Sequence, residues 1–194
     1  GSGEYQIIDH AKANGVSGLI TALGAKFTTG RKLSALTMAL VNTHFGKHQS
    51  SKRSKLIGSQ YDSLNAFTDT KIEQYKVVLS ANTIRHLIML YGSQLDEFIS
   101  RIKDNPLLHD KICAQQEDIL GQIVWAIETE QCVSLNDALF NRTSLGLLGI
   151  KDTEVQTVAT LMSDHLQWSQ EMLSEQVAQV THRLSQTAAA LKHS

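Results

Sequence analysis

The sequence predicts a mainly α-helical protein in which a short two-stranded β segment and one helix precede a larger helical bundle. Three observations support this fold class. From about residue 69 to the end of the chain, apolar residues recur at the spacing of amphipathic helices. The 194 residues include only one proline, so few positions force a helix to stop. Two short apolar runs with the length of strands lie within the first 25 residues.

The first element is a pair of strands. We predict one strand at Tyr5-Gln6-Ile7-Ile8, a turn at Ala13-Asn14-Gly15 and a buried strand from Gly18 to Leu23. Gly1-Ser2-Gly3 shows no capping or packing pattern, so we read it as a cloning remnant or an arbitrary cut. Because a lone pair of strands is marginally stable in water, this pair should belong to a larger sheet or pack on the next element.

A helix is predicted from about Phe27 to Phe45. Gly24 and Ala25 let the backbone turn closely after the second strand, and Thr28 or Thr29 can cap the helix. One face of this helix is apolar, with Leu33, Leu36, Leu40 and Val41. The first amides of a helix lack partners and its dipole is positive at that end, so this strand–turn–helix segment should attract negative charge, helped by Lys26.

The segment that follows has no apolar period. Residues 47–55 are polar and basic, and we interpret residues 46–68 as a linker whose scattered apolar side chains lie across the helical body. A basic run of this kind can touch phospholipid head groups or nucleic acid, but a solvated loop is the commoner case. The expected domains are therefore residues 1–45 and 69–194.

The bundle is read from its apolar stripes. Gly92-Ser93 should end one helix and cap the next, Asn105-Pro106 should end that one, Ser134 should cap a short helix, and Gly146 and Gly149 should break the chain. The stripes comprise Ile72, Tyr75, Leu79; Ile84, Leu87, Ile88, Tyr91; Leu95, Phe98, Ile99, Ile102; Ile119, Leu120, Ile123, Val124, Ile127; Val155, Val158, Ala159, Met162, Leu166; and Leu173, Val177, Val180, Leu184, Leu191.

Composition excludes several functions. The net charge of −1 does not favour nucleic acid as a partner. Cys113 and Cys132 form no C-x-x-C pair and fall in helical patterns, which favours a reduced cytoplasmic setting. The eight histidines show no convincing ligand spacing, so we expect no metal site. No apolar run reaches the roughly 20 residues needed to cross a bilayer, so any membrane contact should be peripheral.

Two sets of residues resemble one family. Gly24-Ala25-Lys26-Phe27-Thr28-Thr29-Gly30-Arg31 is similar to the G-G-K-x-T-T-x-R segment of FAD-dependent glycerol-3-phosphate dehydrogenases, where it follows the last strand of the flavin-binding domain. The bundle also follows the order of that family's C-terminal helical domain, with Leu90-Tyr91-Gly92-Ser93, Gly121 to Ala126, Glu130, Ser134-Leu135-x-Asp137-x-Leu139, Asn141-Arg142-Thr143, Leu147-Leu148, Leu161-Met162 and Leu166-x-Trp168. The chain departs from the family at Ala25, Gly30 and Glu128.

The resemblance implies a role for each part. Residues 1–45 would be the C-terminal fragment of the FAD-binding domain, and residues 69–194 a helical cap domain. The cofactor would be FAD, with its N1/C2-carbonyl edge at Gly24, Ala25, Lys26, Phe27 and Thr28, and Arg31 would hold a substrate phosphate. The parent enzyme would oxidise glycerol 3-phosphate to dihydroxyacetone phosphate and pass electrons to a quinone at the membrane surface. We expect no catalytic residue in the fragment.

Less specific interpretations remain open at this point. The turn after Leu23 can be an ordinary strand-to-helix connection, and Arg31 a solvated or ion-paired side chain. The chain lacks the G-x-G-x-x-G fingerprint, so alone it should neither hold FAD tightly nor turn over. As a cap fragment it should bind the N-terminal FAD-binding part of the same enzyme or form a homo-oligomer. The alternative is a non-catalytic helical protein-interaction module.

Overall fold

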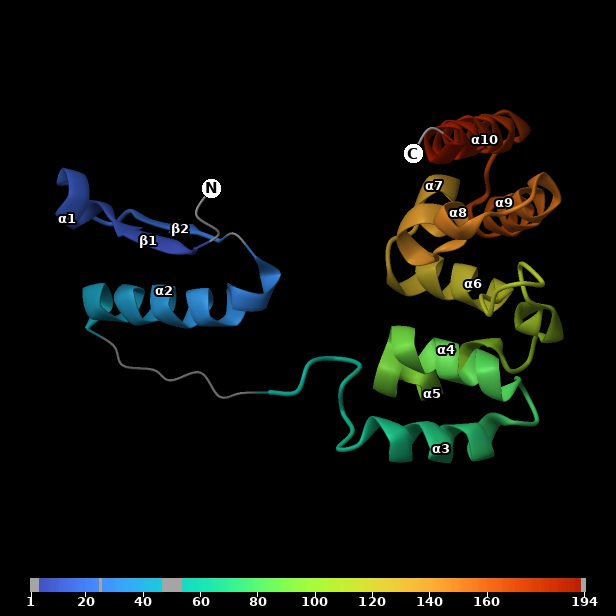
Figure 1. The fold of residues 1–194 in the computed structure, drawn as a ribbon, viewed down its shortest axis with the longest axis horizontal. Coiled ribbons are helices and arrows are strands. Elements are labelled where there is room, and N and C mark those ends of the chain that lie inside the picture. Colours follow the sequence, from blue (N-terminus) through green and yellow to red (C-terminus); the bar gives the residue numbers. More distant parts are fainter. Residues whose placement is uncertain (1–3, 25, 47–53, 193–194) are drawn as a thin grey trace. The chain divides into compact units, whose positions relative to one another are not determined.

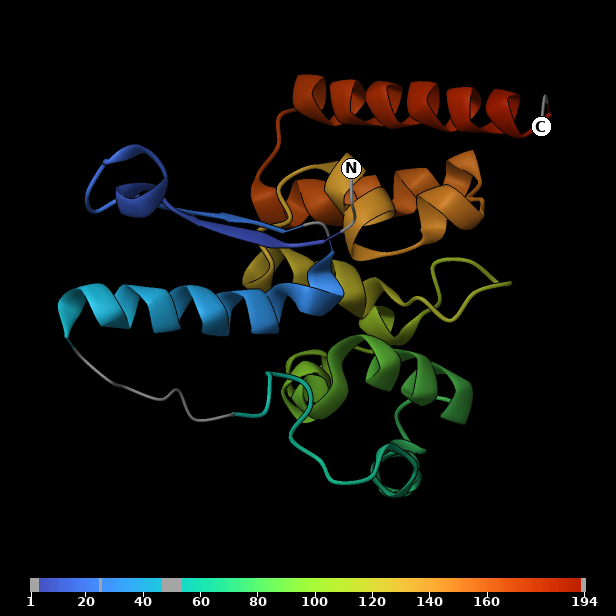
Figure 2. The ribbon, with the colours of Figure 1, turned by 60° about the vertical axis from the view of Figure 1, so that its left-hand side comes forward.

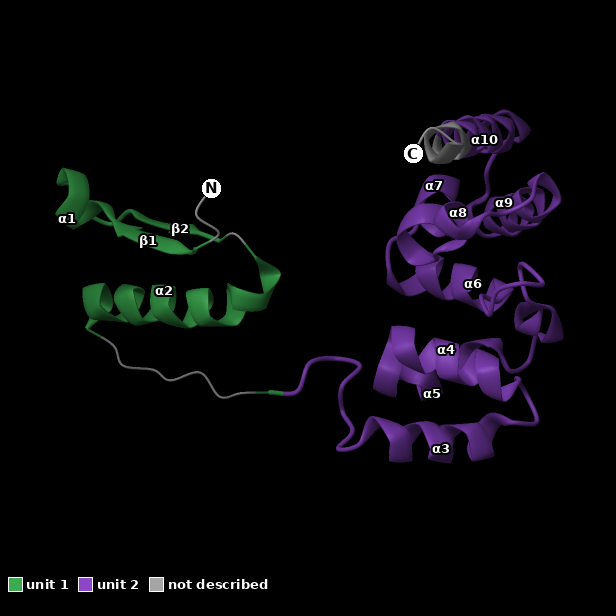
Figure 3. Ribbon diagram, in the orientation of Figure 1, with its two compact units in different colours: residues 1–54 green, residues 55–194 purple. Residues whose placement is uncertain are grey.

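The computed structural model describes residues 4–24, 26–46 and 54–192, with side-chain surroundings as far as residue 186. The chain divides into two compact units, one up to Ser54 and one from Lys55 onward (Figure 3). The described part of the chain is mainly helical and contains one short two-stranded antiparallel sheet. This confirms the predicted fold class.

The first unit is a β-hairpin with one long helix. Strands β1 (Gln6–Asp9) and β2 (Ile20–Leu23) pair antiparallel, with Gln6 opposite Leu23 and Asp9 opposite Ile20. A single 3-10 turn, η1 (Phe27–Thr29), runs directly into α2 (Gly30–Phe45), which lies along the hairpin (Figure 1). The two strands and this helix were expected from the sequence.

A short helix occupies the place where we predicted a simple turn. Helix α1 (His10–Asn14) begins after Asp9, whose Oδ1 accepts a hydrogen bond from the Ala11 amide at 3.1 Å. It ends at Gly15, where φ is +73°. The sequence prediction missed α1 because five residues carry too little apolar period to reveal a helix.

No described residue of β1, α1, β2, η1 or α2 is buried. The second strand was expected to be buried, yet Ile20 and Thr21 are only partly covered and Ala22 and Leu23 are exposed. Leu19 and Phe45 are also exposed. Apolar side chains are normally removed from water when partners are at hand, so this unit lacks a covering layer.

The second unit consists of helices in layers that follow the order of the chain, from α3 to α10 (Figures 1 and 2). Its elements are α3 (Leu64–Tyr75), α4 (Ala81–Tyr91), η2 (Gly92–Gln94), α5 (Leu95–Ile102), η3 (Pro106–His109), α6 (Leu120–Thr129), α7 (Leu135–Asp137), the π-helix η4 (Ala138–Arg142), α8 (Leu145–Leu148), α9 (Asp152–Leu166) and α10 (Gln170–Lys192).

Two apolar clusters form the core of this unit. One gathers side chains of α4, α5 and α6 around Phe98, and the other gathers side chains of α6, α7, α9 and α10 around Met162. Leu120 and Leu161 contact both clusters and therefore join them. The predicted stripes of α4, α5, α6 and α9 are largely buried, which confirms them, whereas Leu191 lies outside the residues whose surroundings are described.

Residues 55–63 lie against the helices rather than apart from them. The Ser93 amide donates to the Gly58 carbonyl at 2.9 Å, and a Cβ at Gly92 would lie 1.8 Å from that oxygen. Helix α3 begins at Leu64 behind the cap Ser63, so the expectation of an irregular segment as far as residue 68 is wrong. Ser93 does not cap α5, because its hydroxyl is bonded to Gln60.

Three further predictions concern the C-terminal half. Ser134 does cap α7, since its Oγ accepts from the Asp137 amide at 3.1 Å. Gly146 does not break the chain; it lies inside α8, where a Cβ would meet the Phe140 ring at 2.7 Å. Cys113 and Cys132 lie in loops rather than in helices. Close packing, which the sequence pattern does not reveal, decides the glycine.

Candidate functional site

The candidate site is the connection between β2 and α2 in the first unit (Figure 1). Gly24 follows β2 directly, and Lys26 has an extended backbone (φ −142°, ψ 140°) just before η1. The chain therefore passes from strand to helix between Gly24 and Gly30. Ala25, which the resemblance assigns to the cofactor, lies outside the described residues.

The outer side of this connection is open. Lys26 and Thr28 are exposed, and the Phe27 side chain is fully so. Within the part of the chain that the structure describes, no acceptor lies against the backbone amide of Phe27 or Thr28. Amide donors, a lysine and the start of a 16-residue helix together give this side partial positive charge. The geometry thus leaves room for a negatively charged or electron-rich group.

The two threonines have different surroundings, and neither caps α2. Thr29 is the residue before α2, but its side chain makes no capping bond. Instead, the Thr29 Oγ1 donates to the Lys26 carbonyl at 3.0 Å, and the Thr29 amide donates to the same oxygen at 3.3 Å. The predicted cap is wrong because η1 already provides the first turn, so the hydroxyl closes that turn and Thr28 stays exposed.

The hairpin and the helix support the connection from below. A Cβ at Gly24 would lie 3.1 Å from Leu33 Cδ2, which is tighter than ordinary contact, so glycine lets α2 approach the end of β2. At the same end of the helix, Lys32 Nζ lies 5.9 Å from the centre of the Tyr5 ring. These contacts set the direction in which α2 leaves the strand.

Arg31 is the second residue of α2 and is exposed. It follows Gly30, where a Cβ would meet nothing within 4 Å. The side chain starts on the first turn of the helix, beside the open amides, so an anion bound there would lie within reach of a guanidinium. The structure brings Lys26, Phe27, Thr28 and Arg31 to one end of α2, as the sequence predicted.

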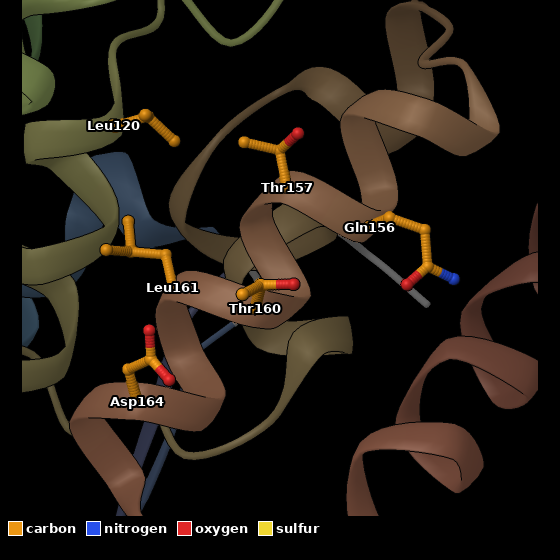
Figure 4. Close-up of a pocket in the computed structure, with 6 residues that line it drawn as sticks. All are labelled: Leu120, Gln156, Thr157, Thr160, Leu161 and Asp164. Carbon is orange, nitrogen blue, oxygen red and sulfur yellow. The ribbon is translucent and has the colours of Figure 1, made fainter. Parts of the chain in front are cut away.

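The second unit has a separate groove along α9 (Figure 4). It has a volume of about 440 Å³ and is lined by Leu120, Gln156, Thr157, Thr160, Leu161 and Asp164. The side chains of Thr157, Thr160 and Asp164 stand on one side of α9 (Figure 4). The groove opens over the seam between the two apolar clusters and contains no strand–turn–helix segment.

Glu128, a departure from the family pattern, has a structural partner. Its Oε2 lies 2.8 Å from Arg101 Nη1, and the Arg101 guanidinium also contacts Glu97 and lies 5.2 Å from the centre of the Trp125 ring. Trp125 Nε1 donates to Glu130 at 3.0 Å, and Trp125 is 3% exposed. Trp125 is a core residue, as expected.

The cysteines are poor nucleophiles. Burial, with a smaller contribution from Glu154, raises the pKa of Cys113 to about 12. Burial also raises the pKa of Cys132 to about 11. A thiol with so high a pKa carries almost no thiolate near neutral pH. Among the described residues, no group of three or more His, Cys, Asp or Glu side chains is arranged to hold a metal ion.

Comparison with known proteins shows the family. The sequence profile described as the C-terminal domain of alpha-glycerophosphate oxidase matches residues 49–173, which is more than half of the chain. The matched region covers most of the helical unit and stops near the start of α10. The chain therefore belongs to the family of C-terminal domains of alpha-glycerophosphate oxidase.

Individual relatives extend the match into the first unit. A glycerol-3-phosphate dehydrogenase of Synechocystis sp. is 27% identical over 180 residues, which cover 88% of this chain and 31% of the relative. A probable mitochondrial glycerol-3-phosphate dehydrogenase of Dictyostelium discoideum is 25% identical over 176 residues, covering 87% of this chain and 27% of the relative. The resemblance to that family is confirmed, and the chain spans less than a third of the length of these relatives.

Proposed function

We propose that this chain is the C-terminal part of an FAD-dependent glycerol-3-phosphate dehydrogenase. The observation that supports this most directly is the coincidence of the family match with an open, positively polarised connection at Lys26, Phe27 and Thr28. Both relatives are named for glycerol 3-phosphate oxidation. The parent protein would convert glycerol 3-phosphate to dihydroxyacetone phosphate.

The residues of the connection fit one edge of FAD. The amides of Phe27 and Thr28 face no acceptor among the described residues, and the exposed side leaves space for a flat ring. Gly24 and Ala25 would let the backbone approach it. When bound, FAD supplies a hydride acceptor. Fixed amide dipoles directed at its N1/C2-carbonyl edge would stabilise negative charge there without reorganisation, an effect of a few kcal/mol, about 3, in a dry site.

Arg31 would serve the substrate. A phosphate monoester carries close to two negative charges near neutral pH, and a guanidinium binds phosphate oxygens with two parallel hydrogen bonds. Arg31 is exposed on the first turn of α2, where the helix dipole adds to its charge. We assign it to substrate binding, whereas the proton and hydride transfers would depend on residues of the parent outside this chain.

The first unit would complete the flavin-binding domain of the same protein. Its described residues include no buried side chain, while Leu19, Leu23 and Phe27 are all about half or more exposed. A covering partner that contributes a third strand or a helix layer would remove this apolar surface from water. We propose that the partner is the N-terminal FAD-binding part of the enzyme, so that the isolated fragment is inactive.

The helical unit would act as a cap, and the parent would pass electrons to a quinone at the cytoplasmic face of a membrane. Among the described residues, no helix is both long and apolar enough to span a bilayer. A peripheral contact, made by the parent or by a homo-oligomer of it, would then provide access to the quinone. These assignments rest on the family rather than on a contact within the chain.

The test is to express the protein at its full natural length. The purified parent should show a flavin absorbance spectrum and reduce an electron-accepting dye with sn-glycerol 3-phosphate, and sn-glycerol 1-phosphate serves as the control substrate. An FAD-loaded parent that ignores glycerol 3-phosphate would contradict the substrate. A parent without flavin, whose helical unit instead captures an unrelated protein, would favour the interaction module.

A further inference from the structure

A carboxylate and a histidine lie at the end of the first unit that is opposite the candidate site. Asp9 is the last residue of β1, and His44 lies in the last turn of α2, 35 residues further along the chain. His44 Nε2 lies 3.3 Å from Asp9 Oδ2. In Figure 1 the end of the hairpin that carries α1 lies beside the C-terminal end of α2. This contact therefore joins the hairpin to the far end of the helix.

Asp9 performs two tasks with its two oxygens. Its Oδ1 accepts from the Ala11 amide and caps α1, while its Oδ2 faces the His44 ring. The Asp9 side chain is only 9% exposed, and that of His44 is 35% exposed. A nearly buried carboxylate is stable only when hydrogen-bonded or paired, so the contact with His44 matters more than one between two solvated side chains.

The other charged groups near Asp9 do not titrate near neutral pH. Lys12 Nζ lies 4.0 Å from Asp9 Oδ2, is 82% exposed, and stays charged. On the neighbouring strand, Asp9 is opposite Ile20, which is apolar. Among the described residues, His44 is thus the group facing Asp9 whose charge changes between about pH 5 and 8.

The nearest other histidine is occupied elsewhere. His10 Nδ1 lies 2.9 Å from the Asn14 Oδ1, and His10 Nε2 lies 2.9 Å from the Thr21 Oγ1. These two contacts fix the ring within α1 and β2 rather than toward α2. Lys32, the basic residue that contacts the hairpin from α2, does so at Tyr5, at the opposite end of the helix.

We propose that Asp9 and His44 form a pH-dependent clasp that holds the last turn of α2 against the β-hairpin. When His44 is protonated, an ion pair with Asp9 joins the two elements. As pH rises and the imidazole loses its proton, the ion pair is lost and only a neutral hydrogen bond remains. The contact is therefore stronger at the acid end of the range and weaker at the alkaline end.

The clasp has consequences for the whole unit because few other contacts compete with it. No described residue of the hairpin or of α2 is buried, so apolar packing holds the two elements only weakly. The candidate connection at residues 24–30 lies at the opposite end of the same helix. Fixing the C-terminal end of α2 therefore fixes the angle at which its N-terminal amides leave the sheet.

Hydrogen exchange of the complete chain tests the clasp without any cofactor. The last turn of α2 ends at Gly46, whose amide donates to the Asn42 carbonyl, so the amides of His44 to Gly46 report on it. Between about pH 5 and 8, we expect their protection factors, corrected for intrinsic exchange, to fall two- to fivefold, which is the range measured for pairs of this kind.

Two variants isolate the pair. Asp9→Asn keeps an oxygen that can cap α1 but removes the charge, and His44→Gln removes the titrating group; both should abolish the pH dependence. His182→Gln, at an exposed position of α10, is the matched control and should retain it. If the protection of the last turn does not change with pH, or if the change persists undiminished in either variant, the clasp does not exist.

Discussion

The two units solve the problem of stability in different ways. The helical unit buries whole side chains such as Phe98, Leu87 and Met162, which are not exposed at all. The hairpin and α2 have no buried residue among those described, and are connected by a glycine contact, a cation–π contact and a histidine–carboxylate pair. The difference indicates that the helical unit can fold alone, whereas the first unit depends on a partner that covers it.

The same pair of residue types also behaves differently in the two units. In the helical unit, His86 Nε2 lies 3.1 Å from Asp118 Oδ1, and Asp118 is 4% exposed. Gln122 Nε2 donates to the same oxygen at 3.1 Å, so a second hydrogen bond supports the buried carboxylate. Asp9 in the first unit has only an amide of its own short helix in addition to His44. A packed core thus adds partners that the hairpin lacks.

The largest expected effect separates the two units by the same substitution. Phe98→Ala removes a fully buried ring that stacks on Tyr91, with centroids 5.0 Å apart, and should lower the free energy of unfolding of the helical unit by about 3–5 kcal/mol. Phe27→Ala removes a fully exposed ring and should change stability by less than about 0.5 kcal/mol. Urea unfolding followed by circular dichroism measures both. Equal losses would contradict the contrast between the units.

Gly92→Ala should have the next largest effect. The added methyl would lie 1.8 Å from the Gly58 carbonyl oxygen, and φ at Gly92 is +54°. We expect a loss of about 3 kcal/mol and release of residues 55–63 from α4. Gly149→Ala is the control, since φ is +104° there but the space is open, so only backbone strain of about 1–2 kcal/mol should appear. The same small loss at both sites would show that the contact with Gly58 is unimportant.

Ser134→Ala should have a moderate effect that depends on pH. The Ser134 hydroxyl hydrogen-bonds to Asp137 at 2.6 Å and, with help from Asn141, holds the pKa of that carboxyl below its ordinary value. A lowered pKa adds stability that is present above the ordinary value of about 3.9 and is lost as pH falls through the folded value. The variant should therefore lose about 1 kcal/mol at neutral pH and less in acid. A loss that is constant from pH 7 to pH 2 would contradict the assignment.

Gly30→Ala should have the smallest effect and the opposite sign. Gly30 has helical angles (φ −55°, ψ −43°), and a Cβ there would meet nothing within 4 Å. Alanine should stabilise α2 by about 0.5–1 kcal/mol because it restricts the unfolded chain. Slower hydrogen exchange across α2 would show this gain. Faster exchange would indicate a contact at this position that the free first unit does not have.

The sequence predicted regular features well because burial imposes a period. The stripe Val155, Val158, Ala159 and Met162 is buried as expected, and the glycine-rich connection lies between a strand and a helix. It did not predict which threonine hydroxyl is exposed, since a 3-10 turn replaced the capped helix start. It also missed the Asp9–His44 contact, because residues 35 positions apart show no joint pattern until the hairpin and helix have folded.

The raised pKa values of Cys113 and Cys132 have a practical consequence. Both thiols are buried, so a maleimide at neutral pH should leave them unmodified. A cysteine introduced by Thr28→Cys, at an exposed position, would then carry a fluorescent label at a single place. Quenching or a spectral shift of that label, on mixing with the separately expressed remainder of the parent, would report directly when this edge of α2 becomes covered.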